Sequence, residues 1–412
     1  MASVLFKNCA LLDPLVPNLL KQHDVLVVDD RIAKVSDTPI PTQVDQVIDV
    51  KGKTLMPGLI DCHVHVMATQ LNLSTQGVLP DALVMMRAVP IMEAMLRRGF
   101  TTVRDAGGAG WGLKCAIEEG TIDGPRLFTA GRALSQTGGH GDPRPRSDHL
   151  KPMSFCGCCF RAGDIGRVAD GVDAVRKAVR EEFQMGADHI KIMASGGVAS
   201  PTDPIGAWGY SDDEISAIVA EANGRQTYVM AHAYTAEAIA RAVNLGVRTI
   251  EHGNLIDEST AQLMAQKGAY AVPTLVTYEA LAKEGAALGF PVDSVAKIEV
   301  VRQAGLTALA LLKKAGVKIA YGSDLLGATQ RLQSDEFKIR TQIMSNFEVI
   351  QSATVIGAEV LNQVGKLGRL QEGAFADILI VDGNPYEDIT CLLGQGDHID
   401  LVMKAGKIYA QR

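Results

Sequence analysis

The chain has 412 residues, of which 47% are hydrophobic and 21% charged, and this composition excludes a disordered polypeptide. Its formal net charge of −7 argues against the broad positive surface that nucleic-acid phosphates require. No apolar run approaches the length of a transmembrane helix, and the N-terminus shows no secretion signal. The seven cysteines are an odd number in a long chain, which argues against a disulfide framework. We therefore expect a cytoplasmic globular protein with neither a nucleic-acid nor a membrane partner.

Short β-strands are predicted at both ends of the chain, where β-branched and apolar residues alternate or cluster. These segments are Ser3–Phe6, Val25–Val28, Arg31–Val35, Gln46–Asp49, Asp377–Val381, Leu401–Lys404 and Lys407–Ala410. Because the middle of the chain has a different pattern, we expect residues 1–57 plus 365–412 to form a small β-sandwich domain from both termini.

Between them, residues 58–364 alternate short apolar runs with stretches of helical periodicity, the pattern of βα units around a parallel sheet. The predicted strands are Leu59–Val66, Thr101–Ala106, Arg126–Gly131, His189–Ala194, Thr227–His232, Thr249–Gly253, Tyr270–Thr274 and Ile319–Asp324. Predicted helices include Val168–Met185, Asp212–Asn223, Ala236–Leu245 and Val295–Ala315, and Ser211 is placed to cap one of them. Eight such units predict an α/β fold with a (β/α)₈ TIM barrel.

Two loops are longer than a connection requires, Gly131 to about Asp164 and Ala194–Tyr210. Both follow predicted strands, so in a barrel they lie over the C-terminal face, where chemistry takes place.

The first predicted barrel strand carries His63 and His65, two residues apart. This spacing puts both imidazoles on one face of a strand, and neutral imidazole is the commonest metal ligand in proteins. The alternative is a pair of histidines on a polar strand face.

Later predicted strands add potential ligands at or near their ends: Lys191, His232, His252 and Asp324. Parallel strands bring their ends to one rim, and a chance arrangement would scatter these residue types over helices and lower strand ends. The combined pattern favours a metal site.

Lys191 fits such a site only in a modified form, because an ammonium group donates hydrogen bonds and cannot coordinate a cation. A desolvated lysine beside metal loses its proton, and the neutral amine can react with carbon dioxide to form a carbamate whose two oxygens bridge two ions. The alternative is a structural lysine paired with a carboxylate.

With these residues, the sequence resembles the amidohydrolase superfamily, whose entry and exit signatures match Leu55–Asp61 and Gly373–Asp377. The resemblance covers essentially the whole chain. It implies two divalent metal ions, expected to be zinc, although manganese and cobalt accept similar ligands. It further implies that His63, His65 and Asp324 hold one ion, that His232 and His252 hold the other, and that Lys191 bridges them as N6-carboxylysine.

Within the superfamily, the chain is most similar to metal-dependent dipeptidases related to imidazolonepropionase, including prolidase-like members and amidases of ochratoxin-type N-acyl amino acids. The supporting segments are Thr137–Asp142, Lys191–Gly197, His232–Tyr234 and Tyr321–Asp324. The bridging lysine favours the peptidase branch over imidazolonepropionase itself. Cyclic-amide hydrolases of hydantoinase type share that lysine and remain an alternative, as does a non-catalytic scaffold.

The resemblance implies hydrolysis of an amide bond in a small substrate with a free carboxylate, a dipeptide or an N-acyl amino acid. Asp324 is expected to accept a proton from the attacking water and to deliver it to the leaving nitrogen. His140, in a glycine-rich loop, is a candidate catalytic residue and substrate contact, able to donate to the substrate carbonyl or carboxylate. Tyr234, two residues after His232, is a candidate substrate contact; for each the alternative is a structural hydrogen bond. Oligomerisation with further copies of the chain is also expected from the family.

Other residues of these types receive structural interpretations. Cys156, Cys158 and Cys159 lack a second pair at zinc-finger spacing, so we expect them to pack within a loop. Arg104 and Asp105 end the second strand without a decided role. The remaining histidines are expected to be structural or on the surface: His23, His149, His189 and His398.

Overall fold

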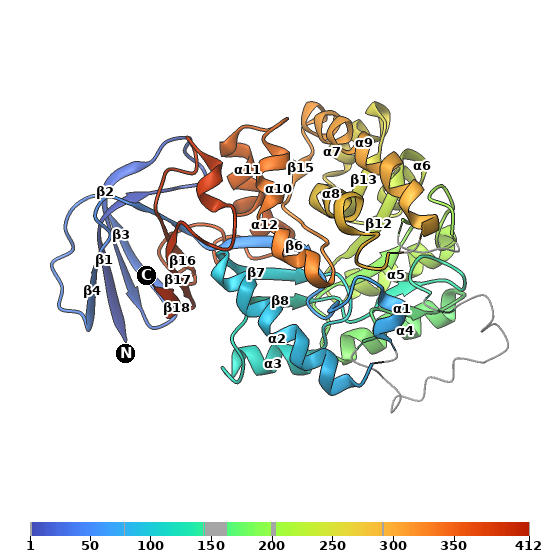
Figure 1. The fold of residues 1–412 in the computed structure, drawn as a ribbon, viewed down its shortest axis with the longest axis horizontal. Coiled ribbons are helices and arrows are strands. Elements are labelled where there is room, and N and C mark those ends of the chain that lie inside the picture. The colour runs from blue at the N-terminus through green and yellow to red at the C-terminus, as the bar shows by residue number, and fades with distance from the viewer. Residues whose placement is uncertain are drawn as a thin grey trace.

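The computed structural model describes residues 2–77, 79–142, 144, 163–198, 203–290 and 292–411. An antiparallel-rich sheet built from both ends of the chain lies at one end of the molecule, with the N- and C-termini beside it (Figure 1). The remainder consists of parallel strands surrounded by helices. The protein is therefore a mixed α/β fold.

The terminal sheet has eight strands, in the order β18-β17-β16-β5-β1-β2-β3, with β4 paired to β1. Phe6, Leu55 and Ile378 are among the buried residues of its core. All seven terminal segments predicted as strands lie in this sheet, while its separation as a domain stays a prediction. Its strands are β1 (Ser3–Leu11), β2 (Leu20–Val28), β3 (Arg31–Ser36), β4 (Gln46–Asp49), β5 (Thr54–Pro57), β16 (Ile378–Val381), β17 (Ile399–Lys404) and β18 (Lys407–Gln411).

The parallel strands fall into two sheets. The first has the order β6-β7-β8 and the second β10-β9-β11-β12-β13-β14-β15. Each of the eight segments predicted as barrel strands overlaps one of these strands, the last of them only at Ile319. Their bounds are β6 (Leu59–Val64), β7 (Phe100–Asp105), β8 (Arg126–Thr129), β9 (Ala133–Ser135), β10 (Gly166–Val168), β11 (Ile190–Met193), β12 (Val229–Thr235), β13 (Thr249–Leu255), β14 (Tyr270–Val272) and β15 (Lys318–Ile319).

Two details differ from the expectation. Strands β9 and β10 occupy parts of the chain predicted as a loop and a helix start, because Ala133–Ser135 pairs with both β10 and β11. The last predicted strand is short, and β15 ends at Ile319, well before Asp324. The chain just beyond β15 nevertheless bonds to β6, as the expected barrel requires, since Cys62 N donates to Tyr321 O at 2.8 Å.

Backbone hydrogen bonds link the two parallel sheets on both sides. On one side, Asp324 N donates to His63 O at 2.8 Å. On the other, Asp188 N donates to Thr129 O at 2.7 Å, which joins the end of β8 to the start of β11. Through these bonds, residues near the C-terminal ends of β6, β11, β12 and β13 come close together.

Helices follow most of the parallel strands, and their buried faces contribute to the largest apolar core. The predicted cap of α5 is confirmed, because Ser211 Oγ accepts from Glu214 N at 3.4 Å while Ser211 N donates to Glu214 Oε2 at 2.7 Å. The helices are α1 (Leu73–Gln76), α2 (Asp81–Arg97), α3 (Trp111–Glu118), α4 (Val172–Gln184), α5 (Asp212–Gly224), α6 (Ala236–Asn244), α7 (Glu258–Lys267), α8 (Leu275–Glu284), α9 (Val292–Ala315), α10 (Asp335–Arg340), α11 (Asn346–Ser352) and α12 (Val355–Val360), with 3₁₀ turns η2 (Gly327–Leu332) and η3 (Ile389–Leu392).

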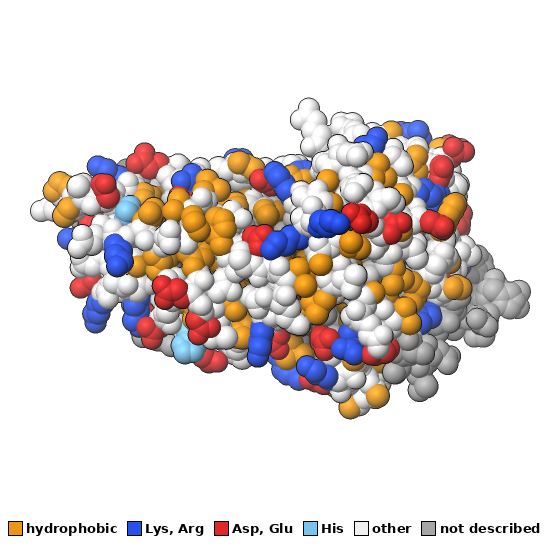
Figure 2. All heavy atoms as spheres, turned by 90° about the horizontal axis from the view of Figure 1, so that it is seen from above, with side chains coloured by type: hydrophobic (Ala, Val, Ile, Leu, Met, Phe, Trp, Pro, Cys, Tyr) orange, Lys and Arg blue, Asp and Glu red, His pale blue; other side chains and the backbone are white. Residues whose placement is uncertain are grey.

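The surface carries charges of both signs, as expected for a chain whose net charge is only −7. On the face shown in Figure 2, acidic and basic side chains are interspersed among apolar ones. Of the helices in the described residues, none combines the length and apolarity that crossing a bilayer demands.

Candidate metal centre

The two histidines at the C-terminal end of β6 point toward the same place. His63 lies on β6 and His65 directly after it, both are buried, and their ring centroids are 5.5 Å apart. Each ring is held through Nδ1: that of His63 lies 2.7 Å from Glu251 Oε2, and that of His65 lies 2.8 Å from the carbonyl of Gly107. Since both partners accept hydrogen bonds, both Nδ1 atoms donate, and in the neutral rings each Nε2 is left with a free lone pair.

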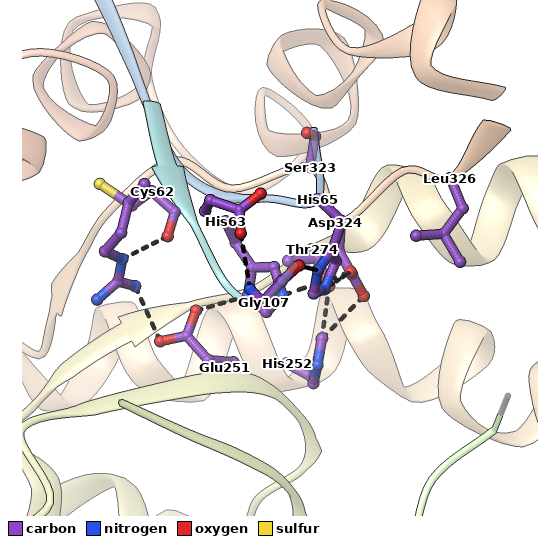
Figure 3. Close-up of polar contacts among 12 residues, drawn as sticks. Cys62, His63, His65, Gly107, Glu251, His252, Thr274, Ser323, Asp324 and Leu326 are labelled. Carbon is purple, nitrogen blue, oxygen red and sulfur yellow. Dashed lines mark hydrogen bonds and ion pairs between the residues drawn. The ribbon is translucent and has the colours of Figure 1, made fainter. Parts of the chain in front are cut away.

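Asp324 meets these two lone pairs. Its Oδ1 lies 3.3 Å from His63 Nε2 and 3.4 Å from His65 Nε2 (Figure 3). The residue has a φ of +50°, uncommon outside glycine, and its backbone N–H is bonded to His63 O. This strained backbone directs the carboxylate toward the histidines, as strain often does at functional sites.

Three acceptors that face one another repel unless they share a cation. The two Nε2 atoms and the carboxylate oxygen all lie within 4.8 Å of one another, a grouping that could hold a metal ion. Two neutral imidazoles and a carboxylate are also ligands that zinc and related metals accept. The residues present therefore fit a divalent metal.

Two more predicted ligands lie beside this group. His252 on β13 has its ring centroid 5.1 Å from that of His63, and its Nδ1 lies 2.7 Å from Thr274 Oγ1 and 3.9 Å from Asp324 Oδ2. His232 on β12 lies 4.6 Å from His252 between centroids. Its Nε2 donates to Gly196 O at 3.1 Å, so Nδ1 carries the free lone pair.

Lys191 on β11 is as completely enclosed as His63, with 1% of its surface exposed. Burial lowers the pKa of Lys191 from 10.5 to about 8, although the charges of Glu251 and Asp324 act in the opposite direction. Among the residues that the structure describes, Lys191 forms no ion pair with a carboxylate.

Charge and burial set the protonation of the group. Burial lowers the pKa values of His232 and His252 well below the ordinary value, which keeps both rings neutral and able to coordinate. Burial alone would raise the pKa of Asp324, but the positive charge and hydrogen bonds that His63 and His65 offer when they are protonated outweigh it and lower that pKa well below its usual range. The carboxylate is consequently ionised at neutral pH.

The predicted substrate contacts flank the histidines on one side. The ring of His140 stacks on that of His232, with centroids 4.3 Å apart, and its Nδ1 lies 3.5 Å from Asp203 Oδ2. Tyr234 lies edge-on to His232 at 4.9 Å, and its hydroxyl is 2.8 Å from that of Tyr278. A small cavity of about 130 Å³ adjoins His140, lined in part by Gly196 and Trp208.

Several residues of the site were not predicted as part of it. Glu251 and Thr274 hold His63 and His252. Asp105, left undecided above, accepts from the backbone N–H groups of Val66 and Gly107, and so shapes the turn that holds His65. A sequence signal could have identified Glu251 as part of the site. It is a charged residue in the middle of a predicted buried strand, and a buried charge needs a partner.

Some predictions concern other regions. His149 and the cysteines 156, 158 and 159 lie outside the described residues. The other four cysteines are free thiols: Cys9, Cys62, Cys115 and Cys391. His189 is buried and stacks on Tyr228, and His23 lies on β2 in the terminal sheet.

The comparison with known families agrees with this geometry. Residues 54–409 match the amidohydrolase family. The chain belongs to that family. An ochratoxinase from Aspergillus niger is 35% identical to this amidohydrolase over 367 residues, covering 86% of this chain and 75% of the relative. This relationship makes the protein a hydrolytic enzyme that acts on amide bonds.

Two solved structures match this amidohydrolase over the full length of both chains. One is an amidohydrolase with 64% sequence identity and a TM-score of 0.98. The other is a prolidase complexed with N-methylphosphonate-L-proline, with 53% identity and a TM-score of 0.97.

Proposed function

We propose that this amidohydrolase cleaves the amide bond of a small carboxylate-bearing substrate, most simply a dipeptide of the Xaa-Pro kind or an N-acyl amino acid. The observation that carries the proposal is the convergence of His63, His65 and Asp324 around one point, with His232, His252 and Lys191 beside it. The 53% identity to a prolidase and the 35% identity to an ochratoxinase support this substrate class.

The proposed site takes two divalent metal ions, with zinc as the expected metal. His63, His65 and Asp324 would hold one ion, His232 and His252 the other, and Lys191 would bridge them as N6-carboxylysine. Forming that carbamate joins Nζ of the neutral amine to the carbon of carbon dioxide and releases a proton. When bound, the cations lower the pKa of water and polarise the scissile carbonyl.

The chain's own residues supply the remaining chemistry. Asp324, ionised and adjacent to His63 and His65, accepts the proton of the attacking water and delivers it to the amide nitrogen, which leaves poorly unless protonated. His140 contacts the substrate carbonyl or carboxylate beside the ring of His232. Tyr234 holds the substrate carboxylate through its hydroxyl, which Tyr278 orients.

The scaffold proposed for this site is a (β/α)₈ TIM barrel of residues 58–364, with a β-sandwich domain from residues 1–57 plus 365–412. The interstrand bonds of Cys62 to Tyr321 and of Asp188 to Thr129 support closure of the parallel sheets. An experimental structure in which β6 did not pair with the chain beyond β15 would contradict it.

A substrate panel tests the function. Zinc-loaded enzyme is incubated with Xaa-Pro and other dipeptides, N-acyl amino acids, and the cyclic amides hydantoin and imidazolonepropionate, and release of free amine or ring opening is measured. We expect the wild type to turn over dipeptides or N-acyl amino acids, and the Asp324→Asn variant to do so at least about 10²-fold more slowly. Turnover confined to the cyclic amides would reject the proposal in favour of a cyclic-amide hydrolase.

A further inference from the structure

Behind the candidate metal centre lies a buried hydrogen-bonded group that connects β6, β7 and β13. Glu251 and Arg104 are each fully buried, with 0% of their surfaces exposed. Glu251 Oε2 faces Nδ1 of His63 at 2.7 Å, on the side of the ring away from Asp324 (Figure 3). Glu251 therefore contacts a proposed metal ligand without reaching the position of the metal.

The other oxygen of Glu251 is fixed by two donors. Arg104 Nη2 donates to Oε1 at 2.9 Å, and Thr249 Oγ1 donates to the same oxygen at 2.7 Å. Arg104 is itself immobilised, because its Nε donates to Cys62 O at 2.6 Å and its Nη1 to Thr249 Oγ1 at 3.1 Å. The guanidinium cannot become an acceptor, so Oε1 must remain one.

This arrangement determines which nitrogen of His63 carries the proton. With Oε1 held by two donors, Oε2 is the carboxylate oxygen left to face the ring, and as an acceptor it requires a proton on Nδ1. The lone pair is then on Nε2, the atom 3.3 Å from Asp324 Oδ1. A hydrogen bond to a carboxylate also raises the basicity of a ligating imidazole and fixes its orientation.

We infer that Glu251, locked by Arg104 and Thr249, is a positioning residue that sets the tautomer of His63 for metal binding. The inference rests on the proposed function, to which it adds a determinant of metal affinity. It gives a role to two charged side chains in a fully buried region, where an ion pair by itself contributes little net stability.

Glu251→Gln tests the inference because its amide is nearly isosteric with the carboxylate. Arg104 and Thr249 require the amide oxygen at the position of Oε1, so the NH₂ group faces His63. The ring must then accept on Nδ1 and carry its proton on Nε2, which removes the lone pair that would bind metal. Zinc affinity is measured by competition with a chromophoric chelator, after circular dichroism has shown that the variant is folded.

We expect Glu251→Gln to bind zinc about 10–100-fold more weakly than the wild type. Glu251→Asp keeps the anion beside Arg104 but is one methylene shorter, so it is the second test should the glutamine variant fail to fold; it too is expected to lose affinity. Glu182→Gln is the matched control, because Glu182 is buried and paired with Arg132 but contacts no proposed ligand. Its zinc affinity should stay within about twofold of the wild type.

The results separate this inference from the proposed function. Unchanged zinc affinity in a folded Glu251→Gln or Glu251→Asp protein overturns the inference, whether or not the enzyme hydrolyses dipeptides. An equal loss in Glu182→Gln would also overturn it, since the loss would then follow from destabilisation alone. If the wild type binds zinc and Glu251 variants weaken it, yet no amide is cleaved, the inference stands and the proposed function fails.

Discussion

Replacing Gly197 with alanine tests the proposed role of His140 without removing any proposed metal ligand. A Cβ atom at Gly197 would lie 2.0 Å from Cε1 of His140, 2.3 Å from Nδ1 and 2.4 Å from Nε2. Since Cβ contacts below 3.0 Å essentially never occur, the ring must retreat by at least 1 Å. The ring of His232 stacks on His140 at 4.3 Å, so retreat in that direction is blocked.

A displacement of this size is large for a group that contacts substrate. Misplacement of a positioned group by about 1 Å can reduce the rate about 10²-fold. We therefore expect Gly197→Ala to lower kcat/KM about 10²-fold against whichever substrate the panel identifies, while zinc bound per chain stays unchanged. The assay is steady-state kinetics together with metal analysis of the same preparation.

Gly206→Ala provides the control, because it lies in the following part of the same connection and its added Cβ meets nothing within 4 Å. Its kcat/KM should equal that of the wild type. A folded, metal-loaded Gly197→Ala enzyme with wild-type kcat/KM would refute the reasoning, because the His140 ring cannot keep its place beside that methyl group.

Three further predictions concern other parts of the molecule. Asp324→Asn keeps the shape of the side chain but cannot accept a proton, so kcat should fall about 10²–10⁴-fold in steady-state assays; a smaller loss would point to another base. Lys191→Ala should abolish binding of a second zinc ion, measured as metal per chain, and retention of two ions would refute the bridging role. Burial, assisted by Arg126, lowers the pKa of Lys404 from 10.5 to about 8, so the folded protein holds that proton less tightly than the unfolded chain. The free energy of unfolding of the wild type relative to Lys404→Met should therefore rise by up to about 3 kcal/mol between pH 8 and 10.5, measured by urea denaturation; parallel pH profiles for the two proteins would contradict this.

The residue types of the candidate site, and the strands that carry most of them, could be predicted from the sequence. His63 and His65 are recognisable as a pair because they lie two residues apart on a predicted apolar strand. Lys191 and His232 lie on strands that short-range hydrophobic patterns predict. Strand and helix periodicity depends on near neighbours, and so the terminal strands and the cap at Ser211 could be predicted in the same way.

The backbone at two site residues could not be predicted. His252 and Asp324 have φ values of +73° and +50°, and no local sequence pattern predicts a positive φ at these two residues. At His252 this conformation interrupts the alternation of the strand, so Glu251 and His252, although consecutive, both approach His63. Alternation alone would have placed them on opposite faces of β13.

By itself, the sequence determined which side chains are available for metal binding and on which elements most of them lie, because those properties follow from residue type and short-range periodicity. Only the tertiary structure decided which atoms meet. Glu251 contacts a histidine 188 positions away in the chain, and Asp324 reaches the same ring from a segment beyond the last parallel strand. Such contacts depend on how distant strands pair and on local left-handed backbone, and both are fixed by the packing of the whole chain.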